Sequence, residues 1–264
     1  MHLKRLIVAA VLLPLIYVYI MYLPSGYFFF LLIIISLLAM SEFYSMYHVQ
    51  GVLRYASLFF GISVLCAAYF STDLLWDTII ISIMAVMVIR LFCKRDPGSS
   101  LSDIAAPAVG LLYIPGLLSF QALLKKGGPE WIIFLYGSVW ASDSIAYYVG
   151  KGIGKRRLYK EMSPNKTVAG AVGSVTGGAI GALILKAAIV PQLTVPNAIF
   201  IGIMIGIISI IGDLVESMFK RDAGVKDSGV IIPGHGGILD KVDGSLFVGP
   251  VLYWGLTVMK IMDR

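Results

Sequence analysis

Charged residues are scarce in this chain. Asp, Glu, Lys and Arg make up 14% of its 264 residues, against about 25% in a typical soluble domain. Hydrophobic residues make up 58%, and the mean hydropathy is +0.88. A soluble fold cannot bury that much apolar surface, so the composition excludes a soluble globular domain and predicts a membrane protein.

Cysteines and long basic runs are also lacking. The two cysteines, Cys66 and Cys93, lie inside or at the edge of apolar runs, without a CxxC or Cys/His spacing. We interpret them as reduced packing residues. The net charge is +6, but the basic residues lie between apolar runs and form no tail. We therefore expect no nucleic-acid partner and attribute the charge to positive-inside bias.

Apolar runs recur along the whole chain. A helix of about 20 apolar residues crosses the hydrocarbon core of a bilayer, which is about 30 Å thick. The runs predict an all-α polytopic membrane protein that forms a single membrane-embedded domain over residues 1–264. We expect about nine transmembrane helices, near residues 6–23, 26–41, 54–70, 74–93, 103–124, 131–150, 168–190, 195–216 and 244–262.

The first run follows Lys4 and Arg5, as in a secretory signal peptide. It is too long for the apolar region of such a peptide and has no A-x-A cleavage site. We therefore expect a retained first span rather than a cleaved leader.

The distribution of Lys and Arg predicts the orientation. Most of these 21 residues lie before Leu6 and at 42–54, 90–102, 151–167 and 217–243. Lys and Arg near span ends mark the cytoplasmic side, so we expect a cytoplasmic N-terminus. Polar residues inside spans are concentrated towards the C-terminus. We therefore divide the chain into a helical scaffold, 1–124, and a catalytic half, 125–264, with cytoplasmic loops at 151–167 and 217–243.

Asp143 is a carboxylate inside a predicted span. It shares one helix face with Ala146, Tyr147 and Gly150, at spacings of three, four and seven residues. A charge in that place costs at least ~2.5 kcal/mol. Asp143 should therefore line a polar cavity, or else be a packing residue bonded to a neighbouring Ser or Tyr.

The basic loop 151–167 ends in Ser163, Lys166 and Thr167, just before a glycine-bearing span. Most of its positive charge needs no explanation beyond positive-inside bias. Lys166 differs, because a phosphate there could meet its ammonium, neighbouring hydroxyls and the free N–H groups of a helix start.

Two acidic pairs lie at the ends of the segment 213–243, which contains the loop 217–243. Asp213 and Glu216 share a helix face with Ser217 and Lys220, and Asp240 precedes Asp243 by three residues at the start of the last span. Oxygen ligands at a water-filled boundary suit Mg²⁺, which usually keeps waters and substrate phosphates.

A glycine turn lies between the acidic pairs, at Pro233, Gly234, His235, Gly236 and Gly237. Glycines allow positive φ and close approach of the backbone to a ligand, and successive N–H groups in such a turn can cradle a phosphate. A lone histidine is more often structural, but this one lies between Lys226, Asp227 and the second acidic pair. Together these features predict a phosphate-and-metal site.

The same stretch resembles the signature of the phosphatidate cytidylyltransferase family, bacterial type. The one departure is Lys241, where that pattern commonly has arginine; it keeps the charge but loses bidentate geometry. The chain also resembles a second recurring block of the same family, at Trp140, Asp143, Tyr147, Gly150, Ser163, Lys166 and Gly170. The signature itself is matched at Ser217, Phe219, Lys220, Arg221, Lys226, Asp227, Gly229, Pro233, His235, Gly236, Gly237, Asp240 and Asp243.

The resemblance implies an enzyme of the bacterial inner membrane that joins CTP to phosphatidic acid, with its site facing the cytoplasm. It implies Mg²⁺, with room for a second or a monovalent cation, and we also expect lipid contacts and allow for a homodimer. The catalytic candidates are Asp213, Asp240 and Lys166. The metal candidates are Asp213, Asp240, Asp243 and Asp227. The substrate-binding candidates are Asp143, Ser163, Lys166, Ser217, Lys220, Arg221, Lys226, His235, Gly236 and Gly237.

Two other functions stay open. A CTP-dependent polyprenol kinase also needs a metal and a nucleotide, but it releases CDP instead of pyrophosphate. A secondary transporter would have paired interrupted helices in two halves, which the sequence does not show.

Overall fold

The computed structural model describes residues 14–231 and 236–262. Nearly all regular structure in these ranges is helical, which confirms the predicted all-α class apart from one short hairpin. The elements run α2 (Ser25–Met46), α3 (Gly51–Phe70), η1 (Thr72–Leu74), α4 (Leu75–Cys93), α5 (Ser100–Leu111), η2 (Leu112–Gly116), α6 (Leu117–Gly127), α7 (Pro129–Ile153), β1 (Arg157–Tyr159), β2 (Ser163–Thr167), α8 (Val168–Ala188), α9 (Val195–Asp222) and α10 (Leu239–Val258).

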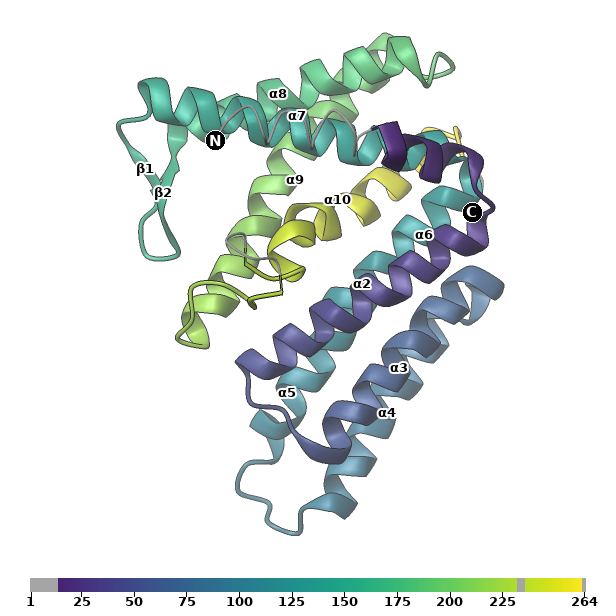
Figure 1. Ribbon diagram of the computed structural model, residues 1–264, viewed down its shortest axis with the longest axis vertical. Helices are drawn as coiled ribbons and strands as arrows, with labels where there is room; N and C mark the ends of the chain where they lie inside the picture. The colour runs from purple at the N-terminus through teal and green to yellow at the C-terminus, as the bar shows by residue number, and fades with distance from the viewer. Residues whose placement is uncertain (1–13, 232–235, 263–264) are drawn as a thin grey trace.

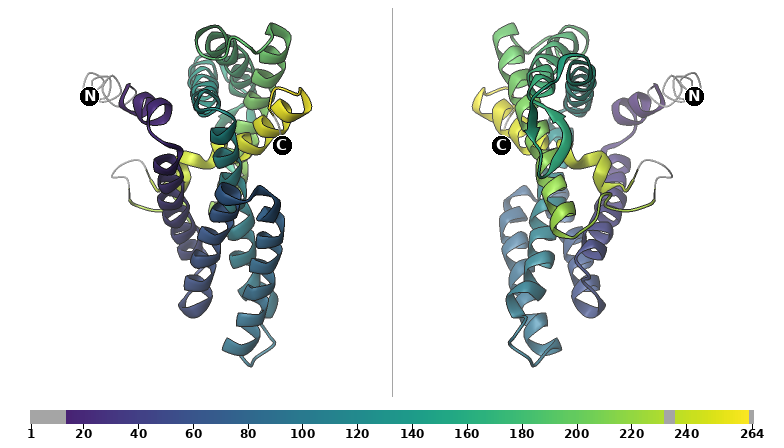
Figure 2. Two further views of the ribbon diagram at one scale, coloured as in Figure 1. Left: turned by 90° about the vertical axis from the view of Figure 1, so that its right-hand side faces the viewer. Right: turned by 90° about the vertical axis from the view of Figure 1, so that its left-hand side faces the viewer.

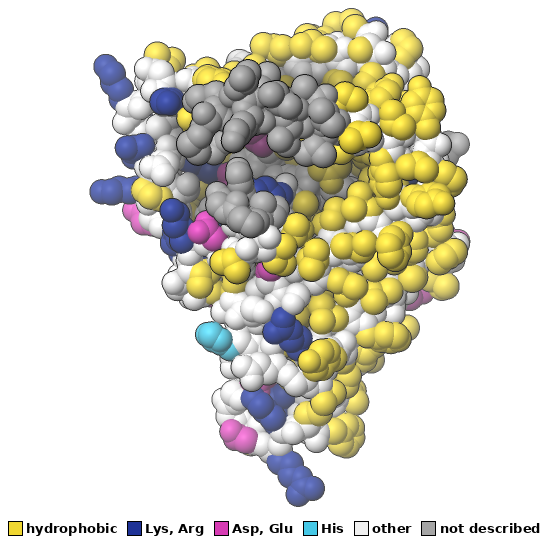
Figure 3. All heavy atoms as spheres, viewed as in Figure 1, with side chains coloured by type: hydrophobic (Ala, Val, Ile, Leu, Met, Phe, Trp, Pro, Cys, Tyr) yellow, Lys and Arg dark blue, Asp and Glu magenta, His cyan; other side chains and the backbone are white. Residues whose placement is uncertain are grey.

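Helices α2 to α6 lie side by side along the long axis of the molecule (Figure 1). Their contacts are made by large apolar side chains, such as Phe43, Leu65 and Leu124, which are almost fully buried. Hydrophobic side chains also cover the outer side of this bundle (Figure 3). Large hydrophobic residues that are exposed include Phe59 of α3 and Ile81 of α4. An apolar exterior of this kind is what lipid contact requires.

The predicted span 103–124 is interrupted. A π-helical turn, η2, separates α5 from α6. Pro107 lies inside α5, and Pro115 lies inside η2. Proline cannot donate the helical hydrogen bond, and π-helical turns often mark functional sites. This turn lies in the interior, where Tyr113 is 6% exposed.

Helices α7 and α8 lie side by side and cross the direction of α2 to α6, so that Figure 2 shows them nearly end on. Small residues bring α8 close to α9: a Cβ on Gly206 would lie 2.6 Å from the carbonyl oxygen of Ser174. Small residues at helix contacts are typical of membrane proteins. The C-terminal helices are therefore packed backbone against backbone.

The segment 151–167, predicted as a loop, contains an antiparallel hairpin in which Arg157 pairs with Thr167 and Tyr159 with Ser163. Thr167 then begins α8, because its Oγ1 accepts a hydrogen bond from the N–H of Gly170 at 3.0 Å. The hairpin fixes the direction in which the side chain of Lys166 projects from the backbone.

Six described helical segments are long and apolar enough to cross a bilayer, and the chain is thus a multi-pass membrane protein. Helices α7 and α10, which we also expected as spans, are less apolar and are not among them. The first expected span, 6–23, begins outside the described residues. The six segments are Ser25–Met46, Gly51–Phe70, Thr72–Cys93, Ser100–Gly127, Val168–Ala188 and Val195–Asp222.

Candidate active site

Helix α9 supplies one side of the site. It continues to Asp222, beyond the predicted end of its span at 216, and so carries its polar residues on one helical face. Ser217 Oγ lies 3.4 Å from Asp213 Oδ1, and Lys220 forms an ion pair with Glu216. These contacts confirm the predicted shared face.

Three carboxylates converge between α9 and α10. One oxygen from each of Asp213, Glu216 and Asp243 lies within 4.8 Å of the other two. The helices can approach this closely because Gly212 has no side chain: a Cβ there would lie 2.8 Å from the carbonyl oxygen of Asp243. We call these three residues the carboxylate cluster.

Glu216 is the buried member of the cluster. Its side chain is 1% exposed, and its Oε1 has no hydrogen-bond partner among the groups that the structure describes. An unpaired buried oxygen is costly unless a ligand satisfies it. The cluster is thus suited to a hard cation.

Lys166 reaches the cluster from the end of the hairpin. Its Nζ lies 2.6 Å from Asp213 Oδ2, and no other described group hydrogen-bonds it. The ammonium therefore lies beside the carboxylates with capacity for a further anionic ligand.

Asp143 of α7 borders the same region. The hydroxyl of Ser209, in α9, lies 3.3 Å from Asp143 Oδ1. Asp213 and Lys166 are close enough to interact electrostatically with the Asp143 carboxyl group. Both interpretations of Asp143 thus find support: it has a serine partner, and it lies beside the polar site.

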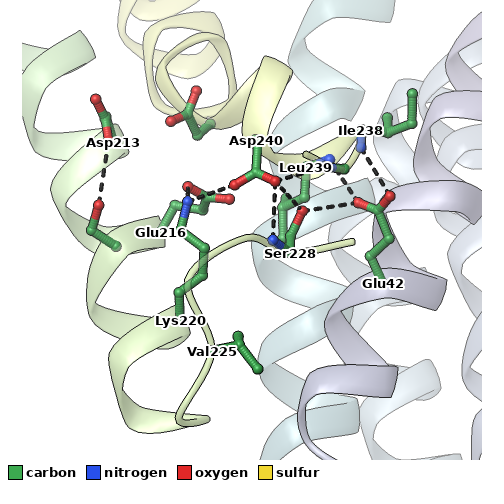
Figure 4. A network of polar contacts seen from close by, with 12 residues as sticks. Glu42, Asp213, Glu216, Lys220, Val225, Ser228, Ile238, Leu239 and Asp240 are labelled. Carbon is green, nitrogen blue, oxygen red and sulfur yellow. Dashed lines mark hydrogen bonds and ion pairs between the residues drawn. The ribbon is translucent and has the colours of Figure 1, made fainter. Parts of the chain in front are cut away.

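Asp240 lies apart from the carboxylate cluster. Its Oδ1 is 2.6 Å from Lys220 Nζ, and its Oδ2 accepts from the N–H and hydroxyl of Ser228, at 3.0 and 2.8 Å, and from the N–H of Gly237 at 2.7 Å (Figure 4). Asp240 precedes the expected last span. Burial raises its pKa, but Lys220 and the three donors outweigh burial and hold the pKa at about 2.

The other predicted residues are more dispersed. Lys226 and Asp227 are exposed and lie outside the carboxylate cluster. Arg221 donates to the carbonyl oxygens of Met162, at 3.3 Å, and Val225, at 2.9 Å. Ser163 lies in β2, where it pairs with Tyr159.

The predicted glycine turn is described only from Gly236 onwards, and His235 lies outside the described residues. Gly236 has a φ of 87°, the positive value expected for this turn. The N–H of Gly237 is directed at Asp240. In the described part, the turn thus binds a carboxylate of the chain itself.

Two residues of the N-terminal half lie at the site although the sequence did not predict them as site residues. Glu42 of α2 accepts three hydrogen bonds from the segment that leads into α10. The hydroxyl of Tyr113 is buried without a described partner, and the charges of Glu216, Asp243, Asp213 and Asp240 act on it. The only signal for Glu42 was an acid at the end of an apolar run, and Tyr113 had none.

Comparisons with known proteins identify the family of the chain. A family model described as the Cytidylyltransferase family matches residues 3–259, almost the whole chain. The chain belongs to this family. Both elements that form the carboxylate cluster, α9 and α10, lie within the matched residues.

Several relatives of the family are named phosphatidate cytidylyltransferase. The chain is 44% identical to one from Bacillus subtilis over 137 residues, 51% of this chain and 50% of the relative. It is 45% identical to one from a Synechocystis strain over 131 residues, 48% and 43% of the two chains. For these two relatives the chain spans about half of their length. The relative from Thermotoga maritima is 34% identical over 183 residues, 67% of each chain.

Proposed function

We propose that this protein transfers a cytidylyl group from CTP to phosphatidic acid, giving CDP-diacylglycerol and pyrophosphate. The observation that carries the proposal is the carboxylate cluster held beside Lys166 in a multi-pass member of the Cytidylyltransferase family. The printed name of the relatives supports the choice of substrates.

Asp213, Glu216 and Asp243 fit Mg²⁺. The donors are carboxylate oxygens, one of them buried and unpartnered, and Mg²⁺ is usually bound by one or two carboxylates together with waters and phosphates. This assignment adds Glu216 to the predicted set and leaves Asp240 and Asp227 as supporting residues. A bound Mg²⁺ would neutralise phosphate charge and align the displacement.

The reaction needs little proton transfer. A phosphomonoester has its second pKa near ~6 and is largely ionised at neutral pH, so a phosphatidate oxygen can attack the α-phosphorus of CTP directly. The bond from the α-phosphorus to the bridging oxygen breaks, and pyrophosphate leaves. The main obstacle is repulsion between two polyanions, which positioning and electrostatic stabilisation overcome.

The basic residues would have different roles in this reaction. Lys166, beside Asp213, would bind a phosphate oxygen of the reacting centre. Lys220 is held between Glu216 and Asp240 and would orient these acids instead of contacting phosphate. The exposed Arg221 and Lys226 would attract the nucleotide, with Ser163, Ser217, His235 and Gly236 near its phosphates, whereas the N–H of Gly237 is bound to Asp240.

We further propose nine spans in a single membrane domain, a cytoplasmic N-terminus and a site that faces the cytoplasm at a bacterial inner membrane. The positions of Lys and Arg support this orientation.

The test uses purified protein in lipid nanodiscs with CTP labelled at either the α- or the γ-phosphorus. Phosphatidate and Mg²⁺ should together give a labelled lipid from α-labelled CTP only, with one pyrophosphate per lipid. Label from the γ-phosphorus and release of CDP would indicate a lipid kinase. Uptake of a solute into vesicles without CTP turnover would indicate a transporter. Other nucleotides in place of CTP provide the specificity control.

A further inference from the structure

Helix α2 ends in a buried carboxylate that the proposed chemistry does not use. Glu42 is 6% exposed and lies one helical turn before the end of α2 at Met46. Oε1 accepts from the N–H of Ile238 at 2.9 Å, and Oε2 accepts from the N–H of Leu239 at 2.9 Å and from the hydroxyl of Ser228 at 3.1 Å (Figure 4). All three donors belong to the chain between α9 and α10 or to the first residue of α10.

Glu42 caps α10 from another helix. Ile238 is the N-cap of α10 and has no capping side chain of its own. The first N–H groups of a helix lack intrahelical partners, and a negative charge there is stabilising. The carboxylate of α2 therefore fixes where α10 begins, and with it the position of Asp240 and Asp243.

Two glycines of the signature segment leave room for Glu42. A Cβ on Gly229 would lie 2.7 Å from Glu42 Oε1, and a Cβ on Gly237 would lie 2.5 Å from Glu42 Cδ. The glycine pattern predicts that Gly237 allows close approach of a phosphate. In this structure it allows close approach of a carboxylate from the other half of the chain.

A chain of contacts leads from Glu42 to the carboxylate cluster. The Ser228 hydroxyl lies within hydrogen-bond distance of both Glu42 and Asp240. Asp240 forms an ion pair with Lys220, which is also paired with Glu216. A displaced Glu42 would thus release groups that hold Glu216 in the cluster.

We propose that Glu42 is a positioning residue of the cytidylyltransferase site. It binds the entry to α10 and, through Ser228, Asp240 and Lys220, keeps the carboxylate cluster in its reactive geometry. As a positioning residue it would act without contacting either substrate. The inference rests on the proposed function for its kinetic consequence, but not for its structural one.

The test compares Glu42→Gln with Asp77→Asn in the full chain in nanodiscs. Each change removes one negative charge from the N-terminal half, but Asp77 is exposed at the start of α4. One readout is hydrogen–deuterium exchange at the N–H groups of Ile238 and Leu239, which requires no activity. The others are kcat, the KM for CTP and the Mg²⁺ concentration for half-maximal rate.

Glu42→Gln should speed exchange at both N–H groups, lower kcat by about 10- to 100-fold and raise the Mg²⁺ requirement, with little change in the KM for CTP. Asp77→Asn should change none of these. Unchanged exchange, or faster exchange with an unchanged kcat, would overturn the proposal.

If Glu42→Gln does not fold, Ser228→Ala removes only the hydroxyl that links Glu42 to Asp240. In that variant kcat should fall, whereas exchange at Ile238 and Leu239 should stay slow because Glu42 still accepts from both N–H groups. A wild-type kcat would equally overturn the proposal. If the wild-type protein itself makes no CDP-lipid, the proposed function fails, and the exchange experiment still decides whether Glu42 positions the start of α10.

Discussion

The two halves of the molecule are packed by different means. Helices α2 to α6 meet through large side chains such as Phe43 and Leu124, whereas α7 to α10 meet through glycines and serines that bring backbones together, as at Gly206 and Gly212. Gly212 brings the backbone of α9 close to that of α10 beside Asp243, and the carboxylates converge next to this contact. The comparison indicates that α2 to α6 serve as a scaffold and that α7 to α10 carry the residues of the site. Glu42 and Tyr113 are the exceptions.

The largest effect should come from the carboxylate cluster. Asp213→Asn, Glu216→Gln or Asp243→Asn should each lower kcat by at least about 100-fold, because direct ligands should exceed the 10- to 100-fold effect of outer ones. Glu161→Gln, in the exposed part of the hairpin, is the matched control. Near-normal turnover in all three variants would show that the carboxylate cluster is not part of the active site.

Lys166 should rank next. Lys166→Ala should lower kcat/KM by about 10- to 100-fold, because the ammonium beside Asp213 is lost, a charge worth about 1.5–3 kcal/mol in a hydrogen bond. Lys160→Ala provides the control, since Lys160 is an exposed lysine of the same hairpin. Equal effects of the two substitutions would mean that only the general basic charge of the hairpin matters.

Packing tests address the two halves directly. Leu124→Ala should destabilise α2 to α6 by about 2–5 kcal/mol, and Gly206→Val should cost about 1–3 kcal/mol by overpacking. Thermal unfolding of the nanodisc-embedded protein measures both. Gly206→Val should also lower activity more than its stability loss alone requires, since it separates α8 from α9; a variant with normal kcat would contradict the backbone-contact argument.

Tyr113 tests the boundary between the halves. Tyr113→Phe should change stability little, because the hydroxyl has no partner among the described groups, but should lower kcat by up to about tenfold if the hydroxyl serves the bound metal or phosphate. The Mg²⁺ dependence of the rate is the measurement. An unchanged dependence would confine Tyr113 to packing against Phe43 and Phe219.

The smallest effect is expected from pH. The folded pKa of Asp240, about 2, lies below the ordinary value near 3.9, so its contribution to stability is complete above that value and is lost only as pH falls towards 2. The stability difference between wild type and Asp240→Asn should therefore be constant from about pH 5 to 8. A difference that declines across this range would show that Asp240 is not held by Lys220 and Ser228.

Much of the fold was predictable because hydrophobic runs and helix periodicity are local. The expected spans at 54–70, 74–93 and 168–190 match α3, α4 and α8 to within a few residues. The π-helical turn at 112–116 and the hairpin after α7 were missed, because each depends on packing that an apolar run does not encode. In the site, the shared face of Asp213 and Glu216 followed from spacing alone.

The sequence by itself determined the membrane class, most helix positions and the acids and lysines from which the site is built, since these follow from composition and from spacings of a few residues. Only the tertiary structure decided which of them meet. It placed Lys166 against Asp213, tied Asp240 to Lys220, and brought Glu42 to Leu239, 197 residues away along the chain. Contacts across such separations depend on how helices pack in three dimensions, and no local pattern specifies them.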